Sequence, residues 1–249
     1  RSAHLRYREA LGEDIGESGG VFKCFQGMQE KWGERIRPTP IAEAAIIGAA
    51  TGAALMGMRP VAEIMFCDFV GVCLDQIANH AAKQRYMSGG ATHVPLTIRM
   101  IAGGGIGGFG AQHSQSTEAM LLHNPGLKIV YPSTPTEAKG LLLSCIFDED
   151  PCIQFESMML TYALKEEVPL GDYRIPLGVA KVKREGSDVT LITYGWQVMQ
   201  CLKAAEELAK EGISAEVLDL RTLLPLDYDR ILASVEKTGR ALVVHAATE

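Results

Sequence analysis

The pattern of hydrophobic and polar positions along this chain predicts strands and helices in alternation, as in α/β proteins. Short apolar runs predict buried strands at residues 61–66, 94–100, 127–132 and 152–156. Apolar residues at helical spacing predict helices at residues 73–87, at 114–123 and after Thr134, where Pro135 and Glu137 complete a capping box. The first helix-period run, RYREAL, continues directly into Gly12, so we expect no strand before Gly12.

A second alternating unit follows a break in the periodicity. The stretch EEVPLGDYRIPLG contains Pro and Tyr and reads as a linker. After it, SDVTLITYG, SAEVLDLRTL and RALVVHA predict strands, and the two segments between them predict amphipathic helices. We therefore expect a first domain over residues 1–156, a linker over 157–178 and a second, incomplete domain over 179–249, with parallel strands in both.

Glu43 is the only charged residue between Pro38 and Arg59, in a run of Ala, Ile, Gly and Leu. Thr39 suits the cap of this helix and Pro40 its first turn, which places Glu43 one position beyond a capping-box glutamate. A carboxylate in apolar packing is costly without a hydrogen-bond partner, and that partner can be a ligand. The alternatives are a bond to a buried backbone group or exposure to solvent. The charge and the many small residues argue against a membrane span.

Composition narrows the function classes. The 249 residues are 47% hydrophobic, enough for a sizeable core, and the net charge of −6 argues against binding to nucleic acid. The six cysteines show neither a disulfide framework nor metal-binding spacing, so we expect reduced thiols in a cytosol-like compartment. The N-terminus lacks the apolar core of a signal peptide, and secretion is not expected.

The glycine-rich stretch GGGIGGFGAQHSQS follows a predicted strand and is a candidate site loop. It lacks the Gly-Lys-Ser/Thr of a phosphate loop and the acidic partner of a dinucleotide fingerprint. His113 lies between this loop and the next helix, where its ring can reach a cleft and donate a hydrogen bond to an anion. A capping or core histidine is the alternative.

Several long motifs, in order, resemble one family: TPIAEAAIIGAA, RPVAEIMFCDF, LDQIANHAAKQRYMSGG, AQHSQS, PGLKIVYPSTPTEAKGLL and DLRTLLPLD. They resemble the β subunits of thiamine-diphosphate-dependent 2-oxo acid dehydrogenases, over nearly the whole chain. The resemblance implies a transketolase-like α/β fold. A pyrimidine-binding domain with a parallel sheet extends to about Glu156, followed by part of a transketolase C-terminal domain. Pro38 departs from the family pattern, which has Asp before Thr-Pro.

The resemblance also implies roles for four site residues. Glu43 matches the glutamate that bonds a ring nitrogen of the cofactor's aminopyrimidine, so that the cofactor's amino group can take the proton of the thiazolium carbon. Phe69 matches the aromatic residue that packs on the pyrimidine, and Glu13 an acidic residue near the cofactor. His113 matches the catalytic histidine that orients the 2-oxo acid and assists acyl transfer. From the residues alone, Phe69 reads as core and Glu13 as a turn or cap residue.

A monovalent cation, K⁺, is the second ligand that the resemblance implies. Family β subunits hold it through carbonyl and side-chain oxygens, and hard oxygen ligands suit such an ion. Asp150 stands where a close relative has Asn, and the role of the ion would be structural. The matching positions here are Val94, Leu96, Thr97, Cys145, Asp148 and Asp150.

The expected activity is oxidative decarboxylation of a 2-oxo acid with acyl transfer to a lipoyl carrier. Gly171-Asp172-Tyr173 is not the Gly-Asp-Gly start of a magnesium-diphosphate motif, so Mg²⁺ and the diphosphate are expected on an α subunit. This also argues against a self-sufficient transketolase-like enzyme. The expected assembly is an α2β2 heterotetramer bound to a lipoyl-bearing acyltransferase core, in the bacterial cytoplasm or the mitochondrial matrix.

Three substrates are open: pyruvate, branched-chain 2-oxo acids and acetoin. The stretches KGLLLSCI and DPCIQFE favour a branched-chain 2-oxo acid. An acetoin dehydrogenase β subunit is one alternative, and a non-catalytic nucleotide-binding α/β module is another. Activity that depends on thiamine diphosphate and an α subunit separates the enzyme from the binding module.

Overall fold

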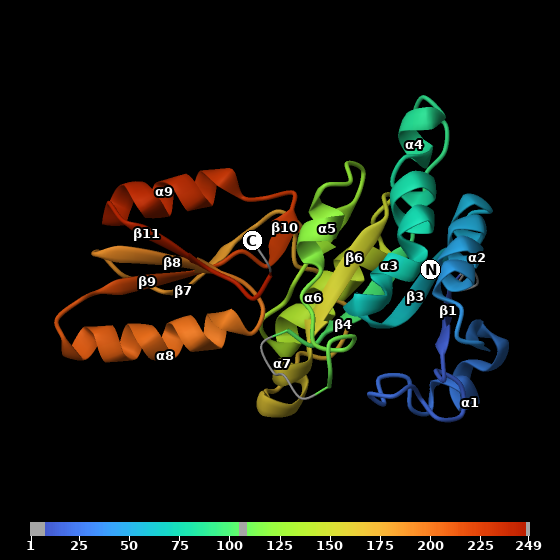
Figure 1. Ribbon diagram of the computed structural model, residues 1–249, viewed down its shortest axis with the longest axis horizontal. Coiled ribbons are helices and arrows are strands. Elements are labelled where there is room, and N and C mark those ends of the chain that lie inside the picture. The colour runs from blue at the N-terminus through green and yellow to red at the C-terminus, as the bar shows by residue number, and fades with distance from the viewer. Residues whose placement is uncertain (1–7, 105–108, 248–249) are drawn as a thin grey trace.

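The computed structural model describes residues 8–104 and 109–247, which form two sheets side by side (Figure 1). One sheet has seven strands in the order β10-β5-β6-β4-β3-β1-β2, and the other has four in the order β11-β8-β9-β7. Both sheets carry helices on their faces. The chain is therefore an α/β protein, as the alternating pattern predicts.

The seven-stranded sheet is parallel except at one edge. Its strands are β1 (Arg8–Glu13), β2 (Ile36–Thr39), β3 (Arg59–Phe66), β4 (Thr97–Ala102), β5 (Lys128–Val130), β6 (Cys152–Ser157) and β10 (Thr222–Leu224). The first six run parallel to their neighbours, whereas β10 is antiparallel to β5. The C-terminal part of the chain thus supplies the edge strand of a sheet built mainly from the N-terminal part.

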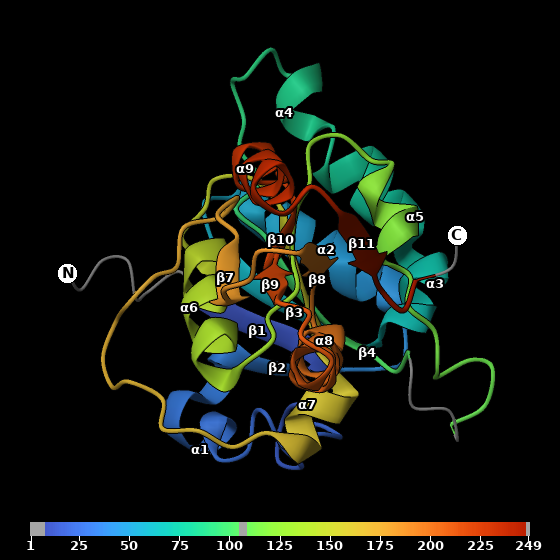
Figure 2. The same ribbon diagram turned by 90° about the vertical axis from the view of Figure 1, so that its left-hand side faces the viewer.

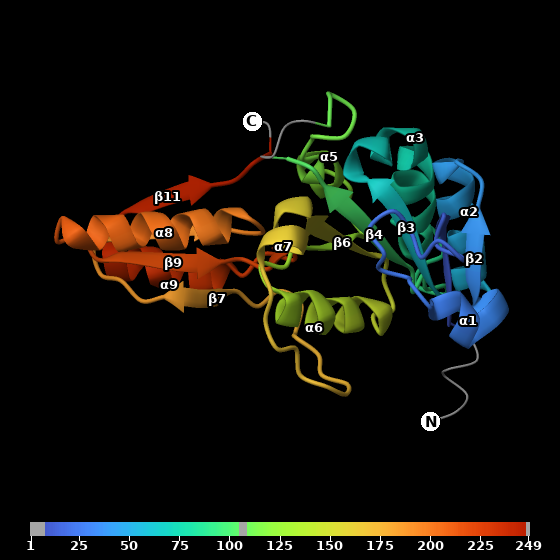
Figure 3. The ribbon, with the colours of Figure 1, turned by 90° about the horizontal axis from the view of Figure 1, so that it is seen from below.

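Helices lie on both faces and at the ends of this sheet. They are α1 (Met28–Trp32), α2 (Glu43–Leu55), α3 (Val70–Asp75), α4 (Gln84–Met87), α5 (Glu118–Leu122), α6 (Pro135–Ile146) and α7 (Met158–Ala163), with short turns of helix η1 (Gly33–Arg35), η2 (Cys67–Phe69) and η3 (Gln76–Ala81). Figure 3 shows α2, α3 and α5 on one face and α6 on the other. The predicted linker, 157–178, contains α7.

The four-stranded sheet lies between two long helices. It consists of β7 (Lys181–Arg184), β8 (Val189–Thr193), β9 (Ala215–Asp219) and β11 (Ala241–Val244), with α8 (Gln197–Lys210) and α9 (Tyr228–Thr238) on opposite faces (Figure 2). β8 is parallel to β9 and to β11, which confirms the predicted βαβαβ unit. β7 is antiparallel to β9 and was not predicted.

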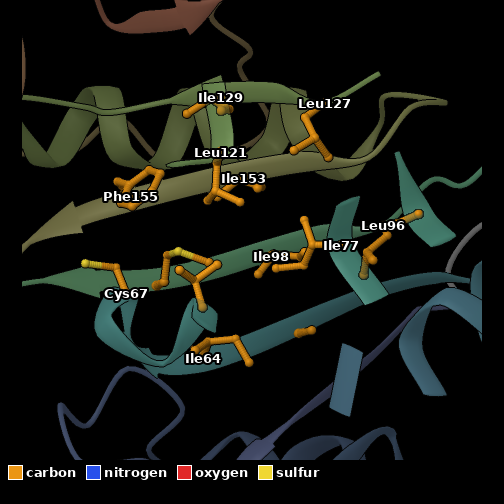
Figure 4. Close-up of a cluster of buried hydrophobic side chains, with 14 of the residues drawn as sticks. Ile64, Cys67, Ile77, Leu96, Ile98, Leu121, Leu127, Ile129, Ile153 and Phe155 are labelled. Carbon is orange, nitrogen blue, oxygen red and sulfur yellow. The ribbon is translucent and has the colours of Figure 1, made fainter. Parts of the chain in front are cut away.

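A continuous apolar core lies between the central strands and the helices on one face (Figure 4). Ile64, Ile98, Ile153 and Phe155 come from three neighbouring strands, and each is at most 1% exposed. Fully burying such a side chain contributes about 1.5–3 kcal/mol. The central strands therefore form a rigid base for the loops at their ends.

The start of the chain differs from its prediction. Residues 8–13 form the strand β1, which pairs with both β2 and β3, so the expectation of no strand before Gly12 is wrong. The first residues of the predicted helical run lie outside the described residues. Ala10 and Leu11 are buried in this sheet. Tertiary pairing on both sides overrides the weak local helical period.

The helix that carries Glu43 also begins later than predicted. Thr39 does not cap it: Thr39 is the last residue of β2 and pairs with Glu13 of β1. Ala42 is the N-cap, and Glu43 is the first helical residue. The predicted helix over 73–87 is divided into α3, η3 and α4, and the one over 114–123 is shortened to α5. Thr134 caps α6 as predicted, its hydroxyl accepting from the Glu137 amide at 3.2 Å.

Candidate functional site

The four predicted site residues lie at the carboxyl ends of adjacent parallel strands. Glu13 is the last residue of β1, and Glu43 opens the helix after β2. Phe69 ends the turn after β3, and His113 lies on the segment after β4. Since these strands are neighbours in the order β4-β3-β1-β2, their carboxyl ends meet at one edge. Ligands of α/β sheets bind at this edge.

Glu43 is 7% exposed, and its carboxylate receives no hydrogen bond from any described residue. Its position at the N-terminus of a 13-residue helix favours a negative charge there. Burial, together with the charge of Glu43, raises the pKa of Cys73 to about 12. A buried carboxylate without a partner fits a ligand that brings its own donor, such as a protonated or amino-substituted heterocycle.

Glu13 shares this environment. Burial raises the pKa of the Glu13 carboxyl, and the negative charges of Glu43 and Asp14 raise it further. Glu13 is 9% exposed. Two carboxyl groups that interact in a buried place compete for one positive or hydrogen-bonding partner. This pair therefore reinforces the case for a donor ligand beside Glu43.

His113 and Phe69 contact each other directly although 44 positions separate their numbers in the chain. Their ring centroids lie 5.3 Å apart at an interplanar angle of 87°, and His113 meets Phe66 in the same edge-to-face way at 5.0 Å. Edge-to-face aromatic contacts of this kind stabilise a fixed orientation. Two of the predicted site residues thus lie in one place.

Two glycines let the loop before His113 pack closely on the segment that follows it. A Cβ at Gly103 would lie 2.2 Å from the carbonyl oxygen of His113, and one at Gly104 would lie 1.9 Å from Ser116 Oγ. Neither distance is tolerable, so these positions need glycine. This bears out the reason for singling out the glycine-rich stretch, of which residues 105–108 lie outside the described part of the chain.

The residues predicted to hold a cation form two neighbouring runs. The carbonyl of Val94 accepts from the amide of Leu96 at 2.7 Å, and that of Leu96 accepts from Cys152 at 2.8 Å. The carbonyl of Cys145 accepts from the Asp148 amide at 3.1 Å. The carbonyl oxygens of Val94 and Leu96 each keep a second lone pair, whereas that of Cys145 also accepts from the Phe147 amide. These carbonyls fit the role of hard oxygen ligands.

The carboxylates of the same set are already neutralised. Lys128 Nζ lies 2.7 and 2.8 Å from the two oxygens of Asp148 and 3.3 Å from Asp150, which also meets Arg85 at 2.6 Å. These cations, chiefly through the Arg85 hydrogen bond, hold the pKa of Asp150 below its usual value despite its partial burial. Thr97 Oγ1 is buried without a hydrogen-bond partner among the described residues. The carbonyls and Thr97 thus fit a monovalent cation, and the two carboxylates do not.

The seven-stranded sheet has one cavity at the amino ends of its strands and another at their carboxyl ends. One of about 850 Å³ is bounded by η3, α4, residues 125–128 and Asp150-Pro151. It lies at the amino ends of β5 and β6, away from Glu43. Another of about 250 Å³ lies at the carboxyl ends of these strands, between residues that begin α6 and residues of α7. The smaller cavity therefore shares the edge of the candidate site.

Two buried polar contacts near this edge were missed by sequence reasoning. Glu118 begins α5 and accepts from the Tyr194 hydroxyl at 2.9 Å. Ser133 lies 2.5 Å from Asp219. In the sequence, the one local hint of a buried polar contact was the acidic residue Glu118, directly before the apolar run AMLL. The contacts themselves join residues 76 and 86 positions apart, which no local pattern reveals.

Both parts of the chain match known protein families. The family "Transketolase, pyrimidine binding domain" matches residues 9–162, and "Transketolase, C-terminal domain" matches residues 178–249. Among solved structures, a chain described as "Split gene transketolase, inactive beta4 tetramer" has a TM-score of 0.79 and 24% identity, covering 97% of this chain and 73% of that one. This likeness confirms the predicted transketolase-like fold.

Curated relatives are closer in sequence. The beta subunit of acetoin:2,6-dichlorophenolindophenol oxidoreductase from Cupriavidus necator is 52% identical over 248 residues, covering 96% of this chain and 73% of that protein. The beta subunit of the Bacillus subtilis pyruvate dehydrogenase E1 component is 52% identical over 238 residues, with 95% and 73% covered. The 2-oxoisovalerate dehydrogenase subunit beta of the same organism is 50% identical over 240 residues, with 96% and 73% covered.

Among the described residues, no helix is both long enough and apolar enough to cross a membrane. The same residues contain no cluster of three or more His, Cys, Asp or Glu side chains able to hold a metal ion.

Proposed function

This chain belongs to the transketolase-like family of 2-oxo acid dehydrogenase β subunits, and we propose that it acts with an α subunit and thiamine diphosphate in oxidative decarboxylation of a 2-oxo acid. The observation that carries the proposal is the buried Glu43 carboxylate, which no described residue bonds, at the ligand-binding edge of the sheet. Relatives that oxidise pyruvate, 2-oxoisovalerate or acetoin share half of its sequence.

Glu43, Glu13 and Phe69 are the residues that would hold the aminopyrimidine. Glu43 would share a hydrogen bond with a ring nitrogen, which would give its carboxylate a partner and hold a proton at that nitrogen. Glu13 lies close enough for the charge of Glu43 to raise the pKa of its carboxyl, in addition to burial, so the two acidic groups share one side of the proposed site. Phe69 packs against the ring and excludes water. Bound thiamine diphosphate supplies the carbon centre at which a 2-oxo acid loses CO₂.

His113 is proposed to act on the substrate. Its ring, held edge-on by Phe66 and Phe69, donates a hydrogen bond to the substrate carboxylate and then assists transfer of the acyl group to a lipoyl arm. Contact with Phe69 places it next to the proposed pyrimidine site. His113 is therefore positioned to affect acyl transfer more than cofactor binding.

The remaining proposals concern assembly. The α subunit would supply Mg²⁺ and the diphosphate site in an α2β2 heterotetramer that docks on a lipoyl-bearing acyltransferase core, in the bacterial cytoplasm for a bacterial source. The first domain would end at residue 156 and the second would begin at residue 179, with a linker over 157–178 between them. K⁺ would be held by the carbonyls of Val94, Leu96 and Cys145 and by the Thr97 hydroxyl, as a structural ion.

Reconstitution tests the function. The chain is mixed with a cognate α subunit, Mg²⁺ and thiamine diphosphate, and turnover of pyruvate, 2-oxoisovalerate and acetoin is compared. We expect turnover of one of the 2-oxo acids, and calorimetry on the β chain alone should show negligible cofactor binding. Preferred turnover of acetoin would establish the alternative substrate. No turnover of any of them, or micromolar cofactor binding by the β chain alone, would contradict the proposal.

A further inference from the structure

Glu118 is a buried carboxyl group for which the proposed mechanism has no use. It is 1% exposed, and burial raises the pKa of its carboxyl. Oε1 accepts a hydrogen bond from the Tyr194 hydroxyl at 2.9 Å, whereas Oε2 has no partner among the described residues. Tyr194 is 9% exposed and follows β8 of the four-stranded sheet. The hydrogen bond from Tyr194 therefore ties this carboxyl group to the other sheet.

The segment before Glu118 is tied to the turn that carries Phe69. The hydroxyl of Thr117 donates to the carbonyl of Cys67 at 2.9 Å, and the thiol of Cys67 donates to the carbonyl of Gln115 at 3.4 Å. The amide of Gln115 donates to Asp68 Oδ1 at 3.2 Å. Residues 115–118 thus connect η2 on one side to Tyr194 on the other, and His113 lies two positions before them.

The helix that begins at Glu118 cannot fix this segment by itself. α5 has five residues, and a helix of this length has little stability of its own. Aromatic rings hold Tyr194 in place instead: Tyr131 lies 5.4 Å away, and the His245 ring is nearly parallel at 6.4 Å. Tyr194 is therefore held in place by its neighbours, whereas the position of Glu118 depends on its hydrogen bond to Tyr194.

We propose that the hydrogen bond between Glu118 and Tyr194 positions His113 against Phe69, so that the four-stranded sheet sets the geometry of the catalytic histidine. Without the Tyr194 hydroxyl, the buried Glu118 carboxyl loses its hydrogen bond to the other sheet and keeps only its own backbone amide and the more distant His245, so it moves toward water. That movement displaces the start of α5 and, through four intervening residues, the His113 ring. Glu118 and Tyr194 are positioning residues, because neither is placed at the reacting atoms. The inference depends on the proposed function only for its effect on turnover.

Two readouts in the full chain assembled with its α subunit test this inference. Hydrogen exchange of the amides in 113–118 reports the segment itself, and acylation of a lipoyl domain reports the histidine. Tyr194→Phe removes only the hydroxyl. Tyr131→Phe is the matched control, because it removes a hydroxyl from the neighbouring ring of the same stack. Glu118→Gln keeps an acceptor for Tyr194, whereas Glu118→Ala does not.

We expect Tyr194→Phe and Glu118→Ala to speed exchange in 113–118 by about tenfold, the cost of leaving a buried polar group without its hydrogen-bond partner. Lipoyl acylation should slow by a similar factor, with the cofactor dissociation constant within about twofold of normal. Tyr131→Phe and Glu118→Gln should stay near wild type. Equal exchange in the Tyr194 and Tyr131 variants, or faster exchange over the whole chain, would overturn the inference. If the wild type shows no turnover, the proposed function fails, and exchange alone still decides whether Tyr194 holds the segment.

Discussion

Ser133 Oγ and Asp219 Oδ2 lie 2.5 Å apart, joining the loop after β5 to the end of β9 in the other sheet. The same hydroxyl lies 2.9 Å from Glu137 Oε2. A serine has one hydrogen to donate, so it cannot satisfy two ionised carboxylates at once. The two carboxyl groups therefore compete for this hydrogen, and the ammonium of Lys183 lies beside both of them.

The carboxyl of Asp219 titrates above the usual range of an aspartate. Burial and the charge of Glu137 together raise its pKa to about 6, against the opposing charge of Lys183 at 3.4 Å. Arg221, 3.7 Å from Glu137, is the other cation of the cluster. A carboxyl whose pKa is raised by folding stabilises the native state below its unfolded pKa, near 4, and this stabilisation is lost as the pH rises through about 6.

We therefore predict that Asp219→Asn changes the pH dependence of stability. Relative to wild type, the variant's free energy of unfolding should rise by about 2–3 kcal/mol between pH 4 and pH 7, because two pKa units correspond to about 2.7 kcal/mol. Urea denaturation at several pH values measures it. Asp229→Asn, at an exposed carboxylate of α9, is the control. A constant difference between Asp219→Asn and wild type across this range would contradict the prediction.

Glu43→Gln should reduce the activity of the assembled enzyme by about a hundredfold or more, the contribution of a positioned proton-transfer group. Glutamine keeps the size of the side chain but cannot take the charge that holds a proton at the ring nitrogen. Turnover is measured with saturating thiamine diphosphate, and thermal unfolding verifies assembly. Near-normal turnover by a stable variant would return Glu43 to a structural role.

His113→Ala should separate the partial reactions. Cofactor affinity should persist, because Glu43 and Phe69 still contact the pyrimidine, while acylation of a lipoyl domain falls by about a hundredfold. Three quantities are compared: the cofactor dissociation constant, decarboxylation with an artificial electron acceptor, and lipoyl acylation. Loss of cofactor binding together with assembly would instead assign His113 to packing against Phe66 and Phe69.

Thr97→Val should abolish stabilisation by K⁺. The buried Thr97 hydroxyl lacks a partner among the described residues, and valine keeps its shape without the oxygen ligand. In wild type, replacing Na⁺ by K⁺ should raise the unfolding midpoint by a few degrees, about 1 kcal/mol. Thr193→Val is the control, because Thr193 Oγ1 is equally buried and also lacks a described partner but lies in β8. An identical response in both variants would remove Thr97 from the cation site.

The sequence predicted the parts of the fold that local chemistry determines. Strands β3 and β6 are mainly apolar, and Thr134 with Pro135 marks the start of α6, so each of these elements was predicted. β1 was missed because the run RYREAL has a helical period, and pairing on two sides decides its state. Short strands that depend on distant partners, such as β2 and β10, carry too few residues for a period to show.

Some residues of the candidate site could likewise be predicted from the sequence, and others could not. Glu43 could be selected from the residues alone, because it is the one charge in an apolar run. Phe69 and Glu13 could not, since a phenylalanine after a strand and a glutamate in a turn are ordinary; the family resemblance supplied them. Neither the residues nor the family resemblance predicted the contact between Glu118 and Tyr194, because it depends on how the two sheets meet.

The antiparallel edge strand β10 has a consequence for synthesis of the chain. On a ribosome, the edge of β5 stays without its neighbour until Thr222–Leu224 has emerged, long after the other strands of that sheet are complete. An unpaired edge is a template for association with other chains. Nascent chains arrested before this point should therefore depend on chaperones, and they should aggregate more readily than chains released after β10.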